Sequence, residues 1–533
     1  MYVATQADKD WLLNEQRKLY ARSFDNPEFI HRKLWGLVTD PRNLRCSLSR
    51  VARNKGSRTA GVDGITVRRI LKDGEETFIQ GLRVELRSRK YKPSPARRVN
   101  IPKPGKLGET RPLGIPTVKD RVVQGALKQI MEPIFEADFY PSSFGFRPGR
   151  SVHGALEQIR KLLYSPLLSK SPKDEPRLTY QWVIEGDIKG CFDNISHHGL
   201  MNRIRKRIGD NRLNRVIVKF IKAGVMSEGQ FLRTEAGTPQ GGILSPLLAN
   251  IALNVIDERY ERHVWPRSRP KPLHNEKAIR KRALGNRAND RTLGKPVLVP
   301  VRYADDFVIF VCAPKGPNQK ERAEEIARQE KASLAAMLKE SLNLEMSEAK
   351  TFITQVTEPI RFLGFHFRVQ RHPVYGWTSK IVIPKDKSRS IRKSIKVIFN
   401  RKLNNLSLEN RLKELNPVIR GWAYFYRHAT GAKHVFSEID DFVWHTIFRW
   451  LRKKHPKTSY GKLYIKYGAR TLPRRSIKWQ DNINPFELSS VRVSRYRSYW
   501  DTQPNFVSTL MESPVRIERR TPGLEEGNPK TAG

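Results

Sequence analysis

Cysteine is scarce in this chain: Cys46, Cys191 and Cys312 are the only three among 533 residues. Their wide separation matches neither a paired zinc-ligand motif nor a dense disulfide framework. We therefore expect a protein of a reducing compartment, without a cysteine-based metal site.

Long apolar runs are also missing. No stretch approaches the roughly 18 consecutive apolar residues of a membrane-spanning helix, and residues 1–8 lack the apolar core of a signal peptide. The phosphate-binding loop G-x-x-x-x-G-K-[ST] is absent too, which argues against a P-loop ATPase. These absences favour a cytoplasmic protein with no membrane partner.

Acidic residues are few beside basic ones. The chain has 53 Asp and Glu against 100 Lys and Arg, which leaves a net charge of +47. Such an excess predicts a polyanionic partner, most simply nucleic acid. The basic residues are spread through apparently folded segments, which disfavours a membrane surface. The length allows three or four domains.

Carboxylates stand at the ends of two apolar segments. Residues 298–303 and 307–311 flank Asp305 and Asp306, and this pattern predicts two strands joined by a tight turn. An ordinary turn between two core strands would look the same. A second apolar segment, residues 181–186, leads directly into Asp187.

Together the two segments suggest a chemistry. If the strands are neighbours in one sheet, Asp187 and Asp305 meet, with Asp306 in support. Oxygen ligands of this kind suit Mg²⁺. Two such ions about 3.5–4 Å apart activate an attacking oxygen and stabilise a leaving one. The pattern therefore predicts metal-assisted phosphoryl transfer.

Residues 303–306 (Tyr-Ala-Asp-Asp) resemble the active-site box of group II intron-encoded reverse transcriptases, the intron maturases. Residues 187–193 resemble the family's first carboxylate box, and other boxes follow in family order from about residue 60 to residue 467. The resemblance implies an α+β right-hand polymerase with fingers, an antiparallel palm sheet, a helical thumb and basic helical extensions. It implies a bacterial-type RNA-directed DNA polymerase that also binds its intron RNA to assist splicing and mobility.

The resemblance also assigns roles to single residues. Asp187, Asp305 and Asp306 are the expected catalytic residues, and with Ile188 they are the expected positions for two Mg²⁺ ions. The expected nucleotide-binding residues are Lys103, Arg111, Phe192, Gln240 and Lys350. Phe192 would exclude a ribose 2′-hydroxyl, and Lys350 would lie near the leaving pyrophosphate. Each residue also has a purely structural alternative. Lys103 and Arg111 could be solvated loop charges, and Phe192 could belong to the palm core. Gln240 could lie in an ordinary loop before a helix, and Lys350 could be a surface lysine.

The resemblance and the composition divide the chain into five parts. These are a helical extension (1–58), fingers and palm (59–370), a thumb or maturase domain (371–468), a basic DNA-binding segment (469–510) and a polar tail (511–533). Apolar stripes predict three thumb helices, the third capped by Ser437. Residues 261–298 carry 11 Lys and Arg against 3 Asp and Glu with little periodicity, so we expect a basic loop.

The expected partners are intron RNA, an RNA template, a DNA target or primer and deoxynucleotides. The oligomeric state is left open. Arginines and lysines on the helices and loops are the expected nucleic-acid contacts: Arg147, Arg150, Arg392, Lys393, Lys396, Arg420, Arg452, Lys453 and Lys454.

Two other functions fit the same sequence. One is a non-enzymatic RNA-binding splicing factor on a decayed polymerase scaffold, and the other is a reverse transcriptase of another lineage. The intact carboxylates argue against the first, and the maturase-like helices argue against the second. Because no cysteine follows Cys312, we expect no Cys/His-rich nuclease.

Overall fold

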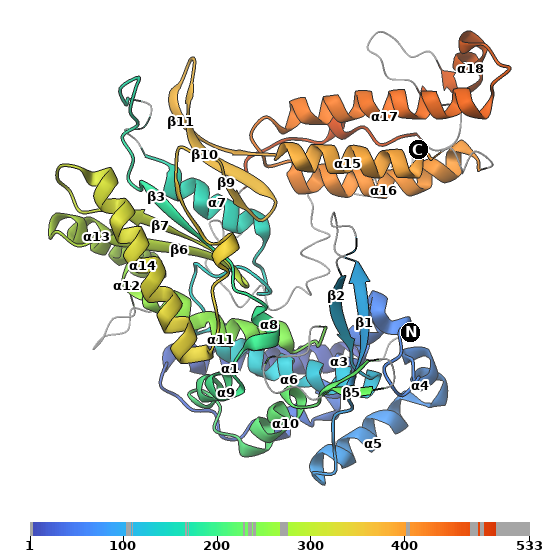
Figure 1. The fold of residues 1–533 in the computed structure, drawn as a ribbon. Coiled ribbons are helices and arrows are strands. Elements are labelled where there is room, and N and C mark those ends of the chain that lie inside the picture. Colours follow the sequence, from blue (N-terminus) through green and yellow to red (C-terminus); the bar gives the residue numbers. More distant parts are fainter. Residues whose placement is uncertain are drawn as a thin grey trace, which may run out of the picture. The chain divides into compact units, whose positions relative to one another are not determined.

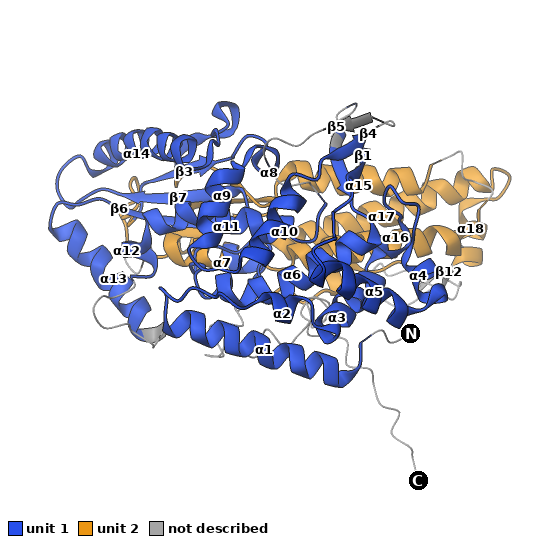
Figure 2. Ribbon diagram, turned by 90° about the horizontal axis from the view of Figure 1, so that it is seen from below, with its two compact units in different colours: residues 1–155, 180–355, 498–533 blue, residues 156–179, 356–497 orange. Residues whose placement is uncertain are grey.

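The computed structural model describes most of the chain in two compact units. The described residues are 4–102, 108, 110–165, 168, 170–227, 230–232, 237, 241–266, 276–400, 406–469, 478–479 and 484–496. Figure 2 colours unit 1 (residues 1–155, 180–355 and 498–533) and unit 2 (residues 156–179 and 356–497). The predicted thumb domain begins at residue 371, whereas the main segment of the second unit begins fifteen residues earlier, at residue 356.

Helices from the N-terminal third build the core of unit 1. The capping box of Thr5 and Asp8 starts the first helix, and Asp40 followed by Pro41 starts the third. Leu44 and Leu48 of the third helix are fully buried. The helices are α1 (Gln6–Asp25), α2 (Trp35–Val38), α3 (Pro41–Arg53), η1 (Lys55–Arg58), α4 (Val67–Asp73), α5 (Glu75–Arg87) and α6 (Val118–Glu136).

Helix α6 is the axis of this core, because nearly all of its residues are buried and both α1 and α3 pack against it. The extension predicted over residues 1–58 is indeed helical, but it shares one hydrophobic core with the palm helices. Gln16 makes this connection polar as well, since its Nε2 donates to the carbonyl of Gln129 on α6 at 2.8 Å.

A small sheet has the strand order β2-β1-β4-β5. Strand β2 contains Pro112, which cannot donate a main-chain hydrogen bond, and it lies at the edge of the sheet as proline requires. The strands are β1 (Ala96–Pro102), β2 (Thr110–Ile115), β4 (Val225–Ser227) and β5 (Gln230–Leu232).

The second sheet of unit 1 is antiparallel, with the order β6-β7-β3-β8. Its central strands are almost continuously buried, as their apolar sequences predict. Helix α14 packs on β3, β7 and β8, and Figure 1 shows it crossing the sheet. The strands are β3 (Trp182–Gly186), β6 (Val297–Tyr303), β7 (Asp306–Cys312) and β8 (Phe352–Gln355).

Further helices are distributed along the chain. Ser151 accepts a hydrogen bond from the Gly154 amide at the start of α7, whose residues from Leu156 onward belong to unit 2. The helices are α7 (Val152–Leu163), α8 (Cys191–Asn194), α9 (His197–Arg205), α10 (Asn211–Ile221), α11 (Ser245–Arg259), α12 (Glu261–Val264), α13 (Glu276–Thr292), α14 (Gln319–Leu342) and η2 (Glu348–Lys350).

The loop predicted over residues 261–298 is wrong, because much of this segment is helical. Helix α13 buries Ile279 and Ala283 one turn apart, and Asp290 two turns further along. Asp290 binds His263 of α12 at 2.9 Å and Arg262 at 2.7 Å. The buried aspartate holds the two helices together, and a hydropathy pattern does not register such a contact.

Unit 2 combines a three-stranded sheet with the predicted three-helix bundle. Ile395, Leu415 and Ile447 are fully buried in the bundle. Helix α17 begins at Ala432 after Gly431, so the predicted cap Ser437 lies inside the helix instead. The elements are β9 (Ile360–Phe362), β10 (Phe365–His372), β11 (Gly376–Val382), α15 (Lys385–Ile398), α16 (Leu408–Tyr426), α17 (Ala432–Lys454), α18 (Tyr460–Tyr467), β12 (Gly468–Ala469), β13 (Lys478–Trp479) and η4 (Leu488–Ser490).

The β9–β10 hairpin explains where this unit begins. Phe365 contacts the rings of Phe425 and Tyr426, and the Tyr426 hydroxyl donates to the Gly364 carbonyl at 3.2 Å. The hairpin is therefore anchored to α16 of the same unit.

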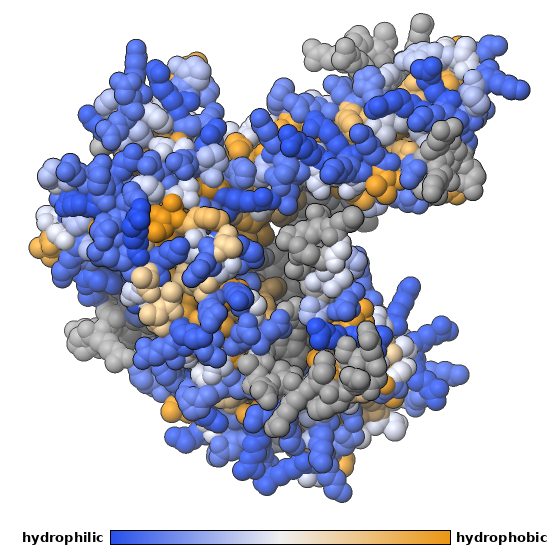
Figure 3. All heavy atoms as spheres, in the orientation of Figure 1, coloured by the Kyte–Doolittle hydropathy of each residue, from blue (hydrophilic) through white to orange (hydrophobic). Residues whose placement is uncertain are grey.

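None of the described helices is long and apolar enough to cross a membrane. The face in Figure 3 is largely hydrophilic, with smaller apolar areas between the charged ones. The three cysteines are buried free thiols, and burial raises the pKa of both Cys46 and Cys312 to about 11.

Candidate active site

The antiparallel register brings the predicted carboxylates to one end of the second sheet. Gly186 of β3 pairs with Phe307 of β7, so the next residue, Asp187, emerges beside Asp306. Tyr303 pairs with Asp306, which leaves Ala304 and Asp305 as a two-residue hairpin loop. The expected meeting of Asp187, Asp305 and Asp306 is thus a consequence of strand pairing.

The turn that carries Asp305 has an unusual backbone. Ala304 has φ of 58°, in the left-handed region that residues with a Cβ rarely adopt. Two-residue hairpins need such positive φ values for their twist to match that of the strands. Gly145 lies against this turn, and a Cβ at Gly145 would stand 2.4 Å from the Ala304 nitrogen.

The carboxylates repel one another. Burial, with a contribution from the charge of Asp187, raises the pKa of Asp305. Removal of water by the surrounding protein, followed by the charges of Asp305 and Asp187, raises the pKa of Asp306 to about 6. Asp306 still keeps a solvent-exposed surface, where a cation could approach it. A cation bound there would relieve the part of the pKa shift that comes from repulsion between the carboxylates.

Lys350 partly offsets this negative charge. Its Nζ donates to Asp187 Oδ2 at 2.8 Å, and this hydrogen bond raises the pKa of Lys350. The lysine follows the segment in which Ile188 bridges Met346 and the Ser347 amide donates to the Asp187 carbonyl at 2.8 Å. Lys350 therefore lies at the site, with its own side chain 67% exposed.

The donor set fits Mg²⁺. Within the described residues, no three His, Cys, Asp or Glu side chains converge into a ready-made metal-binding cluster. Mg²⁺ is commonly held by one or two carboxylates together with substrate phosphates, and it does not need an all-protein cage. Mutually repelling carboxylates at an accessible strand end satisfy that requirement, while Ile188 is buried and offers only main-chain atoms.

Phe192 lies five residues beyond Asp187, at the start of α8. Its ring is half-buried and partly packed on the core. It also meets the exposed ring of Phe146 edge to face, with ring centroids 6.2 Å apart. The position of Phe192 is therefore compatible both with a gate that excludes a ribose 2′-hydroxyl and with a core residue. The sequence pattern gave no sign of the contact with Phe146.

Three predicted nucleotide-binding residues lie wholly or partly outside the part of the chain that the structure describes. Lys103 and Gln240 lie outside the described residues, and of Arg111 only the main chain is described, paired with Ile101. The residues on each side of Gln240 are informative. A Cβ at Gly237 would meet the main chain of Phe192 and Asp193, and one at Gly241 would meet Gly114 of β2. The loop's ends thus lie beside the predicted gate and β2.

The predicted template contact of Arg147 is wrong for this conformation. Its guanidinium is buried, pairs with the buried Glu136 at 2.9 Å through Nε, and donates to the Tyr140 and Ser143 carbonyls. Reaching a phosphate would require this buried guanidinium to leave its ion pair and its main-chain partners, which is costly. Arg150 is half-buried over the Phe144 ring, and its contact stays a prediction.

The predicted contacts on the unit 2 helices lie mostly on exposed surface. Lys393, Arg420, Arg452 and Lys453 are exposed. Others are partly engaged: Arg392 binds Glu438 at 3.0 Å and both Arg392 and Lys396 lie over Phe442, while Lys454 lies over Trp450. Phe442 and Trp450 thus each lie beneath a cation, and Phe436 and Trp450 are buried in the core.

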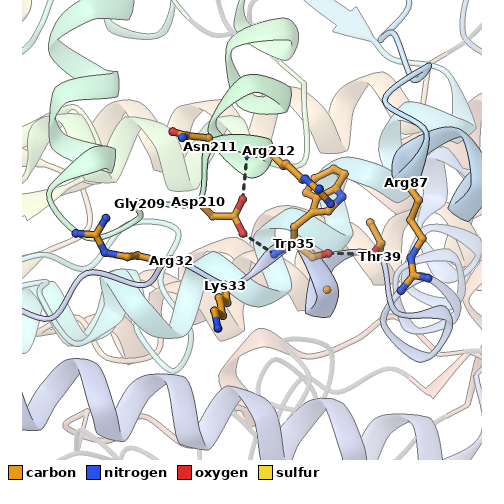
Figure 4. Close-up of a pocket in the computed structure, with 10 residues that line it drawn as sticks. Arg32, Lys33, Trp35, Thr39, Arg87, Gly209, Asp210, Asn211 and Arg212 are labelled. Carbon is orange, nitrogen blue, oxygen red and sulfur yellow. Dashed lines mark hydrogen bonds between the residues drawn. The ribbon is translucent and has the colours of Figure 1, made fainter.

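Unit 1 also contains a basic pocket that sequence reasoning missed. Its volume is about 670 Å³, and Figure 4 shows four cationic side chains around it. Among the described residues none of the four has an ion-pair partner. The buried Asp210 accepts from the Leu34 and Trp35 amides at 2.9 and 2.8 Å, which joins the pocket's walls. The cations are Arg32, Lys33, Arg87 and Arg212.

A second unpredicted feature is Arg302, a fully buried arginine within the apolar strand β6. It donates to the carbonyl of Ala304 in the turn that carries Asp305. The only sign in the sequence is one charged residue in an otherwise apolar strand.

Comparison with known proteins agrees with this geometry. The family described as reverse transcriptase (RNA-dependent DNA polymerase) matches residues 101–367, and the group II intron, maturase-specific domain matches residues 388–468. The first match contains the carboxylates and the second the three-helix bundle.

Individual relatives extend the similarity. Protein YkfC of Escherichia coli is 37% identical over 386 residues, covering 72% of this chain and 95% of that protein. The group II intron-encoded protein LtrA of Lactococcus lactis is 34% identical over 413 residues, covering 72% of this chain and 63% of LtrA. The putative COX1/OXI3 intron 1 protein of Saccharomyces cerevisiae is 26% identical, covering 83% of this chain and 56% of that protein.

The two family matches cover the sheet with the carboxylates and the helical bundle. The expected right-hand polymerase fold of α+β class is therefore confirmed. The chain belongs to the family of group II intron-encoded reverse transcriptases and maturases.

Proposed function

We propose that this protein is an RNA-directed DNA polymerase that extends a DNA primer on an RNA template with deoxynucleotides. The observation that carries the proposal is the strand pairing that places Asp187, Asp305 and Asp306 at one end of an antiparallel sheet, with Lys350 bonded to Asp187. Family membership supports the same reading, and similarity to two bacterial proteins supports the expected cytoplasmic setting.

Each residue of the site then has a chemical task. Asp187 and Asp305 provide the principal oxygen ligands, and Asp306 adds negative charge beside them. Bound there, two Mg²⁺ ions would activate the primer 3′-hydroxyl and stabilise the departing pyrophosphate. Lys350 neutralises the phosphate charge or donates a proton to the leaving group. Phe192 restricts the space beside the sugar of the incoming nucleotide.

We further propose that the protein binds its intron RNA and assists splicing. The supporting observations are the maturase-specific match over residues 388–468 and the exposed cations of α15, α16 and α17. The basic pocket of unit 1 supplies four more cations. Phosphate contacts dominate the affinity of such surfaces for RNA.

Primer extension with purified protein tests the polymerase. Asp305→Ala should reduce Mg²⁺-dependent synthesis by several orders of magnitude while RNA affinity stays within about twofold, because the carboxylate acts on cations and not on RNA. Asp10→Ala, which removes an exposed carboxylate on α1, is the matched control and should behave as wild type. Synthesis by Asp305→Ala at the wild-type rate would contradict the assignment. An inactive wild-type protein that binds RNA would favour the decayed, non-enzymatic alternative.

A further inference from the structure

Arg302 is a charged residue placed where the strand pattern calls for an apolar one. It belongs to β6, and its exposed fraction is 0%. A buried guanidinium is tolerated only when its donors are satisfied, since an unpaired buried charge is very costly. Its partners therefore show what the residue is for.

Two of these partners lie on α11, more than forty residues away along the chain. Arg302 Nε donates to Asp257 Oδ2 at 2.7 Å, and Nη1 donates to Asn250 Oδ1 at 3.2 Å. Asp257 is itself fully buried, and its other oxygen accepts from the Ser142 hydroxyl at 2.8 Å. The guanidinium is thus fixed to a helix and does not depend on the hairpin for its orientation.

Another of its bonds returns to the hairpin. Arg302 Nη1 also donates to the carbonyl of Ala304 at 3.0 Å. That carbonyl belongs to the peptide joining Ala304 to Asp305, and Ala304 has the left-handed φ described above. The guanidinium therefore holds the peptide that leads directly into Asp305.

The opposite side of the turn is held by the same network. Arg302 Nη2 donates to Ser143 Oγ at 2.9 Å, and the Phe144 amide donates to the Arg302 carbonyl at 2.8 Å. Asn250 Nδ2 donates to the Gly145 carbonyl at 2.7 Å. Gly145, which lies against Ala304, is therefore fixed by the helix that also orients Arg302.

We propose that Arg302, oriented by Asp257 and Asn250, is a positioning residue that holds the Ala304–Asp305 peptide and so aims the Asp305 carboxylate for cation binding. This proposal rests on the proposed polymerase function. Arg302 touches no reacting atom, and it acts only through the turn. The simpler alternative is a structural ion pair that joins β6 to α11.

Substitution of Arg302 by lysine distinguishes the positioning role from a purely structural ion pair. Arg302→Lys keeps the positive charge beside Asp257, but an ammonium lacks the planar fork that reaches Asp257, Asn250 and the Ala304 carbonyl together. Arg207→Lys is the matched control. Arg207 is also buried, pairs with Asp138 at 3.0 Å and donates to the main-chain carbonyl of Ser23 on α1.

Two measurements read out the position of Asp305. The first is steady-state primer extension, which separates kcat from the KM for deoxynucleotide. The second does not depend on activity: Mn²⁺ binding is titrated by electron paramagnetic resonance, with a dideoxy-terminated primer on template and a matching nucleotide. Folding is checked by the melting temperature, and RNA affinity is measured in parallel.

For Arg302→Lys we expect kcat to fall at least tenfold and the Mn²⁺ half-saturation concentration to rise at least threefold. The KM and the RNA affinity should stay within twofold, and Arg207→Lys should change neither kcat nor Mn²⁺ binding. Adding Ala304→Gly to Arg302→Lys should recover part of the Mn²⁺ affinity, because glycine adopts a left-handed φ without help. A purely structural ion pair predicts no such recovery.

Other outcomes overturn the proposal. Unchanged Mn²⁺ binding in folded Arg302→Lys, or an equal loss in Arg207→Lys, would reduce Arg302 to a structural residue. If Arg302→Lys does not fold, Asn250→Ala tests the same point with the ion pair intact, and it should weaken Mn²⁺ binding in the same direction; unchanged binding there also rejects the proposal. If the wild type is active and the variants synthesise DNA and bind Mn²⁺ as it does, only the positioning role of Arg302 is refuted. If the wild type is inactive, the proposed polymerase function is refuted as well.

Discussion

At the scale of single residues, similar side chains have different roles because of what lies against them. Arg147 and Arg302 are both arginines of unit 1, and both are buried in ion pairs. Arg147 joins Glu136 of α6 to the main chain of the Ser143 loop, whereas Arg302 reaches the carbonyl of Ala304 in the turn before Asp305. A site residue is therefore recognised by its partners in space, and arginine content alone misassigned Arg147.

Phe192 is the residue at which a prediction about substrate choice can be tested. Phe192→Val should raise the efficiency of ribonucleotide incorporation relative to deoxynucleotide by at least about tenfold, since shortening the ring frees volume for one hydroxyl. The ratio of kcat/KM for the two nucleotides measures this. Deoxynucleotide activity should be partly retained.

The control for this prediction is a phenylalanine of the core. Phe135→Val on α6 should lower stability without changing the nucleotide ratio, because Phe135 is a buried residue of the hydrophobic core. If Phe192→Val lowers both incorporation efficiencies in parallel, the ring belongs to the core and not to a gate.

At the scale of elements, the described N-terminal helices depend on buried polar contacts as well as on apolar faces. His31 is 4% exposed, and its Nε2 lies 2.9 Å from the Ser23 hydroxyl of α1. Its main chain accepts a hydrogen bond from the Gly209 amide and donates to the Arg207 carbonyl at 2.8 Å. The residue thus connects α1 to the turn before α10.

This contact makes stability depend on pH. Burial, followed by the charges of Arg207 and Arg22, lowers the pKa of His31 to about 4, against 6.5 in an unfolded chain. Between these values the unfolded state binds more protons, so stability falls as the pH drops from 6.5 towards 4 and changes no further below that range. At pH 4.5 the loss should be roughly 2–3 kcal/mol.

Urea unfolding at pH 7.5 and pH 4.5 measures this loss. Relative to wild type, His31→Gln should remove most of the pH-dependent difference in the free energy of unfolding. His198→Gln, at an exposed histidine of α9, is the control and should leave the difference unchanged. Equal pH dependence in wild type and His31→Gln would show that His31 does not titrate as described.

At the scale of the whole molecule, the net charge of +47 dominates. RNA affinity should fall steeply with salt, with each neutralised phosphate contributing a log–log slope of roughly −0.7 to −0.9. A filter-binding series from low to high potassium chloride measures the slope. An affinity that does not change with salt would contradict a phosphate-dominated interface.

The location of that charge can be tested separately. Arg452→Glu with Lys453→Glu, at the exposed end of α17, should weaken intron RNA binding and splicing assistance by tenfold or more before primer extension on a simple template suffers. Lys315→Glu with Lys320→Glu makes the same change in net charge at exposed positions beside α14. Equal weakening by both pairs would mean that total charge, and not the maturase helices, determines binding.

The sequence by itself determined the local structure around the carboxylates. Short apolar runs next to aspartates predicted buried strands with a polar end, and β3, β6 and β7 are those strands. Apolar stripes with helical spacing likewise predicted α15, α16 and α17. In both cases the signal lies within a few residues, where side-chain direction follows from backbone geometry.

Only the tertiary structure decided which charges are buried and which helices carry them. Arg302 is explained by Asp257 and Asn250, Arg147 by Glu136, and α13 by Asp290 against His263. Most of these partners lie ten to fifty residues away. A buried charge is stable only where folding supplies its partner, so no pattern within one segment could distinguish the arginines that bind RNA from those that hold the catalytic turn.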